Sequence, residues 1–369
     1  MSGKSRRRWA RVAAGVAVLG GLGITLVTSG CSSGQAGAGP ATVPASPLVT
    51  ATASMAPLSH SGLIGFAAAE LLGADSSGQV QQLEQMKSMG MNTIRVDANW
   101  LGGEPSQGTF DWSTLDTIMA SVHQAGMTAD LIIDGCPPWA AAAGASGQFS
   151  QPASPAQFAA WAAAVATRYH SLGADYFEIW NEPNMVQFWS PAPNPAAYTA
   201  DLVAAYAAIK AADPSSVVIS AGLASVGDTA TTIDPVTFFA AMYAHGAHGS
   251  FDAVGDHPYS FPADPADDSQ GNWGEMAQTS PSLRSLMTEH GDAAKKIWIT
   301  EYGAPTGAVT AAQQTTELTQ AITAAENTSW IGAFYIYTWS DQFGGDGFGL
   351  LDSNGNPKPA YTAVAALTS

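Results

Sequence analysis

Two short apolar runs in this sequence each lead into a glutamate, Glu182 in the segment 176–184 and Glu301 in the segment 296–303. Hydrolysis of a glycosidic bond usually needs two carboxyl groups on opposite sides of the bond. One protonates the leaving oxygen, and the other attacks or directs water. Glu182 and Glu301 are therefore candidates for a carboxyl pair of this kind.

The residues around each glutamate indicate where it stands. The apolar segments 177–180 and 297–299 are β-prone, and Pro183, which has no backbone donor, prevents the first from continuing as an interior strand. Gly303 permits a turn after the second. Both glutamates are thus predicted to lie at the C-terminal end of a strand.

Segments of strand length alternate with segments of helical spacing through most of the chain. Strand candidates are 62–66, 93–98, 127–134, 176–181, 217–223, 251–257, 297–301 and 331–339. Helix candidates are 79–89, 113–125, 155–170, 195–212, 235–245, 282–290, 311–327 and 359–367. Several have a helix-start signal, such as Ser154-Pro155 and Asn194-Pro195, with proline at the first helical position. Eight such alternations predict an α/β fold, a single (β/α)8 TIM barrel. An open doubly wound sheet is the alternative, but no Gly-x-Gly-x-x-Gly motif follows Phe66.

In barrels of this type the chemistry collects at the C-terminal ends of the strands. The other predicted strand ends are suitably polar or aromatic. They carry Arg95, Asp97, Asn99, Trp100, Asp134, Trp139, His257, Tyr259 and Trp339.

Several of these motifs together resemble the clan A glycoside hydrolases, which include the cellulase-type family 5 and the β-xylosidase-type family 39. The motifs are Trp180-Asn181-Glu182-Pro183, Thr300-Glu301-Tyr302-Gly303, Arg95, His257-Pro258-Tyr259 and Trp339. The resemblance covers the whole predicted domain. The triplet Asn-Glu-Pro alone is a weak motif, and it becomes specific because it lies at the fourth predicted strand while a second glutamate ends the seventh.

The resemblance implies a role for each matching residue. Glu182 would be the general acid/base and Glu301 the nucleophile of a retaining mechanism. The remaining substrate-binding roles fall to Asn181 at the sugar 2-hydroxyl, Arg95 and Tyr259 beside Glu301, His257 at the sugar or the acid/base, and Trp339 as the platform under the sugar ring. An ionised Glu301 would also help Glu182 to keep its proton.

Some polar residues have a simpler explanation. Glu178 lies on the same face as Glu182, and a buried carboxylate needs a partner, for which Arg95 is the candidate. We therefore expect a structural role for Glu178. Asp97 and Asp134 are expected to anchor loops.

Aromatic side chains indicate the substrate class. Trp100, Trp139, Trp189, Trp273 and Trp339 fall at strand ends or in the loops after them, where indole rings could pack on sugar faces. The long irregular segment 260–280 could be a lid, a subsite wall or an insertion. No cofactor is expected: Cys/His zinc spacing is missing, and the Gly/Asp-rich loop 341–349 lacks EF-hand spacing.

The N-terminal segment indicates export. Five basic residues precede an apolar stretch, 12–27, which leads to Cys31 after small residues. Residues 1–31 resemble a bacterial lipoprotein signal in which Cys31 is acylated, although Thr28 departs from the usual leucine, and ordinary secretion or an uncleaved anchor stays open. Residues 32–58 have the composition of a flexible linker, which leaves 59–369 as the catalytic domain.

The net charge of the protein limits the classes of molecule that it is expected to bind. Loss of the five basic signal residues would leave 8 basic against 30 acidic residues, a net charge of −22. Such a surface disfavours nucleic acid, anionic lipid and polyanionic glycans. Cys136 would be the remaining thiol, so stability must come from the core.

Taken together, the sequence predicts a monomeric, membrane-anchored or secreted glycosidase, acting outside the cytoplasm on β-linked bonds of a neutral polysaccharide or oligosaccharide. The alternatives are a non-catalytic carbohydrate-binding lipoprotein and a transglycosylase that uses the same intermediate. The two glutamates favour an enzyme over the binding protein.

Overall fold

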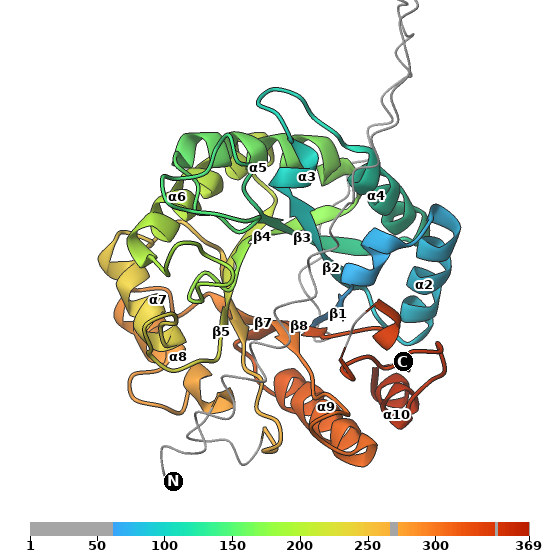
Figure 1. Cartoon of the computed structure of the whole chain (residues 1–369). Helices are drawn as coiled ribbons and strands as arrows, with labels where there is room; N and C mark the ends of the chain where they lie inside the picture. Colours follow the sequence, from blue (N-terminus) through green and yellow to red (C-terminus); the bar gives the residue numbers. More distant parts are fainter. Residues whose placement is uncertain (1–61, 266–271, 344–345, 369) are drawn as a thin grey trace, which may run out of the picture.

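The computed structural model describes residues 62–265, 272–343 and 346–368, and these form one closed barrel. Eight parallel strands pair in sequence order, and β1 pairs with β8 to close the ring (Figure 1). The predicted TIM barrel is confirmed. The strands are β1 (Leu63–Ala67), β2 (Thr93–Asn99), β3 (Thr128–Asp134), β4 (Ala174–Asn181), β5 (Val217–Ala224), β6 (Ala253–His257), β7 (Lys296–Tyr302) and β8 (Ile331–Ile336).

Helices surround the barrel as an outer ring (Figure 1). The α-helices are α2 (Ser76–Ser88), α3 (Trp100–Gly103), α4 (Ser113–Ala125), α5 (Pro155–Tyr169), α6 (Pro195–Ala212), α7 (Pro235–Ala244), α8 (Leu283–Glu289), α9 (Ala311–Glu326) and α10 (Pro359–Thr368). Short 3-10 helices lie at η1 (Ala69–Gly73), η2 (His170–Leu172), η3 (Trp273–Met276) and η4 (Asp341–Phe343). All eight predicted helices are present, and α5 and α6 begin at the predicted prolines.

Side chains alternate between two environments along each strand. Outward residues such as Phe66, Leu131 and Ile299 pack with the helices in the main hydrophobic core. Inward residues at the N-terminal end of the barrel form a smaller cluster that contains Tyr176 and Trp298. The barrel is therefore closed by apolar packing at that end, and polar inward residues are left for the other end.

The last strand is shorter than the predicted segment 331–339. β8 ends at Ile336, and beyond it Thr338 and Trp339 pair through their carbonyl oxygens with the backbone of Leu350 and Leu351. The chain leaves the barrel at this point, so strand alternation no longer determines where Trp339 points.

None of the helices within 62–265, 272–343 and 346–368 is both long enough and apolar enough for a transmembrane span. The predicted signal, Cys31 and the linker lie outside the described residues. Cys136 is a buried free thiol.

Candidate active site

Glu182 reaches the barrel interior through a distorted end of β4. Trp180 and Glu182 adopt left-handed backbone conformations, with φ of 71° and 45°. The Trp180 ring turns outward against Trp189, while Asn181 and Glu182 both contact residues inside the barrel. A positive φ is costly for a bulky residue and is found most often at functional sites. The distortion thus places two consecutive side chains in the interior.

A second distortion places Glu301. The pairing of β7 with β8 shifts register between Ile299 and Tyr302. Within this shift Thr300 Oγ1 lies 3.1 Å from His257 Nε2, and Glu301 also faces the interior. The ends of β4 and β7 therefore converge on one site.

The two predicted catalytic carboxyl groups are neighbours. Glu182, Glu301 and His257 each offer a side-chain atom within 4.8 Å of the others. His257 Nδ1 lies 2.9 Å from Glu182 Oε1 and 3.8 Å from Glu301 Oε2. The imidazole thus stands between the two carboxyl groups and contacts Glu182 directly.

Arg95 links Glu301 to Asn181 and to the buried Glu178. Its Nη1 donates to Glu301 Oε1 at 2.7 Å, and its Nη2 donates to Asn181 Oδ1 at 2.8 Å. Its Nε and Nη2 donate to the two oxygens of Glu178 at 2.5 and 3.1 Å. Arg95 and Glu178 are 3% and 0% exposed, so this bidentate ion pair is fully buried. Glu178 contacts Arg95 as the sequence predicted.

Two tyrosines complete the surroundings of Glu301. The Tyr259 hydroxyl donates to Glu301 Oε2 at 2.8 Å, so each oxygen of that carboxylate accepts a hydrogen bond. Tyr337, which follows β8, packs edge-on against Tyr259 at 6.4 Å between ring centroids. The electrostatic influence of both Glu301 and Glu182 raises the pKa of Tyr337, beyond the larger effect of burial. Tyr337 is half-buried and belongs to the site.

The surroundings move the two carboxyl pKa values in opposite directions. Burial raises the pKa of Glu182, and the negative charge of Glu301 adds to this, against the lowering effect of His257. Burial acts in the same sense on Glu301, but the positive charges of His257 and Arg95 outweigh it and lower the pKa of Glu301. Such a divergence favours a proton on Glu182 and a negative charge on Glu301.

His257 itself responds to the same charges. Burial opposes its protonation, but the charge of Glu301 and the hydrogen bond with Glu182 raise its pKa. The carboxyl–imidazole–carboxyl trio is also the one group among the described residues whose atoms are close enough to hold a metal ion. Its hydrogen bonds account for the arrangement without one.

Further acids lie near Arg95 inside the barrel. Asn99 donates to Asp134 Oδ1 at 3.2 Å, which fits the anchoring role expected for Asp134. Both oxygens of Asp130 lack a hydrogen-bond partner among the described residues. Burial raises the pKa values of Asp97, Asp130 and Asp134, and the positive charge of Arg95 opposes this at each of them.

Trp339 does not occupy the predicted platform position. It is 2% exposed and packs against Phe66 and Tyr361, outside the barrel wall. The inward series on β8 runs instead through Ala333 and Tyr335 to Tyr337. Alternation from Tyr335 was the signal that could have identified Tyr337 as the inward residue.

The loop tryptophans are mostly core residues. Trp100 is fully buried, and its Nε1 donates to Glu104 Oε2 at 2.7 Å; Trp189 is also buried, and Trp273 is 8% exposed. The expected sugar contact is therefore replaced by core packing at these positions. Trp139 is half-buried, packs on Trp100 and donates to the backbone oxygen of Glu104.

The barrel and its glutamates at the ends of the fourth and seventh strands define a barrel glycoside hydrolase. A model of the cellulase family, glycosyl hydrolase family 5, matches residues 54–340. The chain therefore belongs to glycosyl hydrolase family 5. No curated protein matches its sequence.

Solved structures share the fold at low identity. A family 39 glycoside hydrolase from the gut symbiont Bacteroides cellulosilyticus WH2 is 21% identical, with a TM-score of 0.67, covering 83% of this chain and 63% of that one. A monomeric β-xylosidase from Caulobacter crescentus CB15 is 20% identical, with a TM-score of 0.62 and coverages of 84% and 68%. A GH5_18 protein from Streptomyces cattleya in complex with GlcNAc is 17% identical, with a TM-score of 0.61 and coverages of 83% and 79%. This chain thus spans somewhat less than two thirds of the first of these.

Proposed function

We propose that this protein is a retaining β-glycosidase that cleaves a neutral glycan by double displacement. The observation that carries the proposal is the separation of Glu182 and Glu301, whose nearest side-chain atoms in the trio lie within 4.8 Å. Retaining enzymes hold their carboxyl groups about 5 to 5.5 Å apart, whereas inverting enzymes need about 6.5 to 9.5 Å to admit a water.

In the first step Glu301 attacks the anomeric carbon. The bond to the leaving oxygen breaks as the bond to Glu301 forms, and the proton of Glu182 passes to the leaving oxygen. Arg95 holds the Asn181 side-chain oxygen at 2.8 Å, which leaves the Asn181 amide nitrogen to donate to the sugar 2-hydroxyl. That hydrogen bond strengthens as positive charge develops on the ring.

In the second step water releases the sugar. Once Glu301 is esterified its negative charge is gone, and with it one of the influences that raise the pKa of Glu182. Glu182 can then ionise and take a proton from the attacking water, while the bond to Glu301 breaks and restores its carboxylate. The same intermediate could pass to a sugar hydroxyl, which would give transglycosylation.

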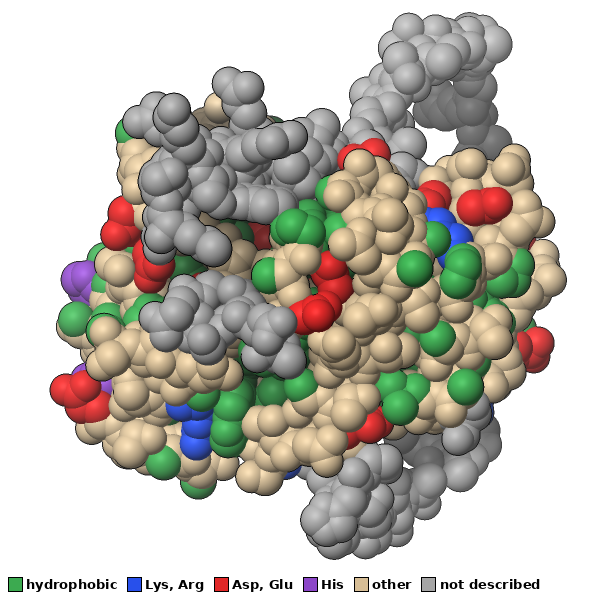
Figure 2. All heavy atoms as spheres, turned by 90° about the horizontal axis from the view of Figure 1, so that it is seen from below, with side chains coloured by type: hydrophobic (Ala, Val, Ile, Leu, Met, Phe, Trp, Pro, Cys, Tyr) green, Lys and Arg blue, Asp and Glu red, His purple; other side chains and the backbone are tan. Residues whose placement is uncertain are grey.

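The charge of the protein supports a neutral substrate. Acidic side chains are spread over the face in Figure 2, and basic ones are few. The formal net charge of the whole chain is −17, which would repel a polyanionic glycan. Neutral β-linked sugars also suit the β-xylosidase and the GlcNAc complex that share this fold.

We further propose that the enzyme acts outside the cytoplasm as a monomer held by a lipid on Cys31. The support is the basic, apolar and small-residue order of 1–31 and the uncharged composition of 32–58. Labelling with a radioactive or alkynyl fatty acid, compared between the native chain and Cys31→Ala, tests the anchor. Unlabelled native protein would contradict it.

Two variants test the assigned roles with aryl glycosides of different leaving groups. Glu301→Gln should lose at least about 10³-fold in kcat on every substrate, because it removes the nucleophile. Glu182→Gln should lose about 10²- to 10⁴-fold in kcat/KM on substrates with poor leaving groups and far less on dinitrophenyl glycosides, whose leaving group needs no protonation in the first step. Glu326→Gln, on the exposed end of α9, is the matched control.

The stereochemistry of the product gives an independent test. NMR of the first product should show the β-anomer before mutarotation. An inverted product, or full activity in either glutamine variant, would refute the proposal.

A further inference from the structure

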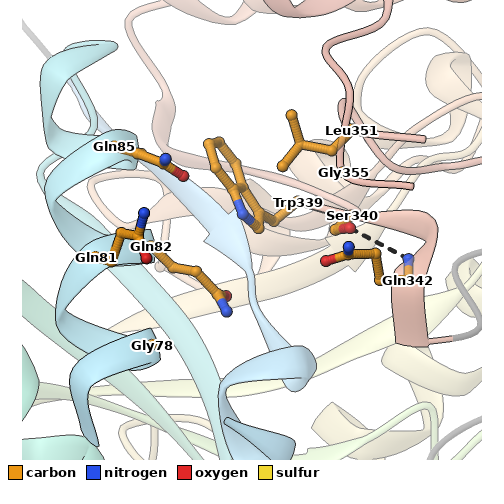
Figure 3. A pocket seen from close by; sticks show the side chains of 9 residues that line it. All are labelled: Gly78, Gln81, Gln82, Gln85, Trp339, Ser340, Gln342, Leu351 and Gly355. Carbon is orange, nitrogen blue, oxygen red and sulfur yellow. Dashed lines mark hydrogen bonds between the residues drawn. The ribbon is translucent and has the colours of Figure 1, made fainter. Parts of the chain in front are cut away.

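A hollow lies on the outer wall of the barrel, between α2 and the chain that follows β8. It encloses about 210 Å³, and its lining comes from α2 on one side and on the other from Trp339, Ser340, Gln342, Leu351 and Gly355 (Figure 3). Trp339 separates it from the barrel, because its ring packs edge-on against the outward residue Phe66 of β1 at 5.1 Å. The hollow is thus distinct from the site of Glu182 and Glu301.

The lining is uncharged and rich in glutamine. Gly78, Gln81, Gln82 and Gln85 follow the spacing i, i+3, i+4 and i+7, so they share one face of α2. Gln342 stands on the opposite side, across from Gln82 in Figure 3. Amide side chains offer both a donor and an acceptor, which suits a ligand with adjacent hydroxyl groups.

Two glutamines of α2, Gln79 and Gln82, differ in whether their side-chain amides are satisfied by hydrogen bonds within the protein. Gln79 is fully used inside the protein: it donates to the backbone oxygens of Leu71 and Ala74 and accepts from Ser121. Gln82, by contrast, has a buried side-chain oxygen without a hydrogen-bond partner among the described residues. A buried acceptor of this kind destabilises the protein unless water or a ligand satisfies it.

Trp339 supplies the apolar part of the lining. In Figure 3 its ring lies between Gln82 and Gln85 on one side and Ser340 and Leu351 on the other. The indole lines the hollow although it is almost wholly buried. An apolar ring beside several amides matches a sugar ring, which has apolar C–H faces and a polar rim.

We propose that this hollow binds one ring of a neutral saccharide, as a second carbohydrate site of the enzyme. A volume of about 210 Å³ is smaller than the roughly 300 to 1,000 Å³ of drug-sized pockets, so it suits a single ring and not a longer segment. The occupant is a residue of the glycan that the enzyme hydrolyses, and the proposal rests in this respect on the proposed function. Binding outside the barrel holds the polymer near the enzyme between cleavage events.

Binding is tested in the Glu301→Gln background, which halts hydrolysis. Calorimetry with cellohexaose, xylohexaose and mannohexaose should show more than one site for at least one of these sugars. Adding Gln82→Met and Gln85→Met should remove one site and leave the other unchanged. Methionine preserves length and helix propensity, and Gln124→Met on the exposed face of α4 is the matched control.

Activity and crystals complete the test. With Glu301 restored, the double methionine variant should lose at least about 3-fold in activity on polymer and keep kcat/KM on an aryl glycoside. A crystal soaked with the bound hexaose should show a sugar ring in contact with Gln82.

The outcomes separate the two proposals. If the native enzyme is active, two results would overturn the second site and leave the proposed hydrolase intact. One is a soaked crystal with only water in the hollow, and the other is unchanged sugar binding after the two methionine substitutions. Failure of the native enzyme to hydrolyse any glycan would instead refute the proposed function.

Discussion

The two ends of the barrel interior are built from the same strands but differ in chemistry. At the N-terminal end, Tyr176 and Trp298 pack edge-to-face at 5.0 Å within an apolar cluster. At the C-terminal end, Arg95 ties Glu178 and Glu301 into a charged network. Within the barrel, an apolar layer that stabilises the fold thus lies next to a charged layer that forms the candidate active site. Substitutions at the two ends should therefore fail in different ways.

The largest effect is expected from Arg95→Met. It leaves the fully buried Glu178 without its cation, and removal of one partner from a buried ion pair costs about 3 to 5 kcal/mol. It also removes a charge that lowers the pKa of Glu301, so activity should fall with stability. Urea unfolding and kcat measured on the folded fraction check both effects.

Arg95→Lys is the conservative control for this prediction. A lysine keeps the charge but cannot donate to Glu178, Asn181 and Glu301 through one planar fork. It should recover more stability than activity. Native-like stability in Arg95→Met would mean that the network does not support the barrel.

The next largest effect, on stability alone, is expected from Trp298→Ala. Truncation of a buried tryptophan costs about 3 to 5 kcal/mol, while kcat at a permissive temperature should stay within about twofold. Trp330→Ala, at a partly buried ring, should cost less. A large loss of kcat in folded Trp298→Ala would break the division between the two ends.

The smallest effect is expected from His257→Asn, which should move the pH profile. The proposed mechanism requires ionised Glu301 and protonated Glu182, so activity should rise with pH through the lowered pKa of Glu301 and fall through the raised pKa of Glu182. The His257 cation lowers both values. Its removal should therefore shift both limbs of the kcat/KM profile to higher pH, whereas His123→Asn on exposed α4 should shift neither.

Sequence periodicity was sufficient for the barrel and for the strand-end positions of Glu182 and Glu301. Strand and helix periods identified every strand, and the β-prone runs before Pro183 and Gly303 placed Glu182 and Glu301 at the right edge. The partnership of Glu178 with Arg95 also followed from the cost of burying a lone carboxylate. These inferences depend on local pattern and on charge, which a sequence displays directly.

The tryptophans could not be placed in the same way. Trp339 lies three residues beyond the end of β8, where the chain has left the sheet, so alternation gave no information about its direction. Trp100 was expected to meet sugar, but Glu104 one helical turn later satisfies its indole nitrogen within the core. Whether an aromatic ring faces a ligand or the protein depends on such tertiary partners.

The position of β1 has a consequence for how the enzyme meets its substrate. The described chain enters at Gly62 and Leu63, at the apolar floor of the barrel, whereas Glu182 and Glu301 open at the opposite mouth. If Cys31 carries the lipid proposed above, the enzyme is attached through the end of the barrel that lies opposite its active site. The anchor would then leave the mouth of the barrel open to glycans.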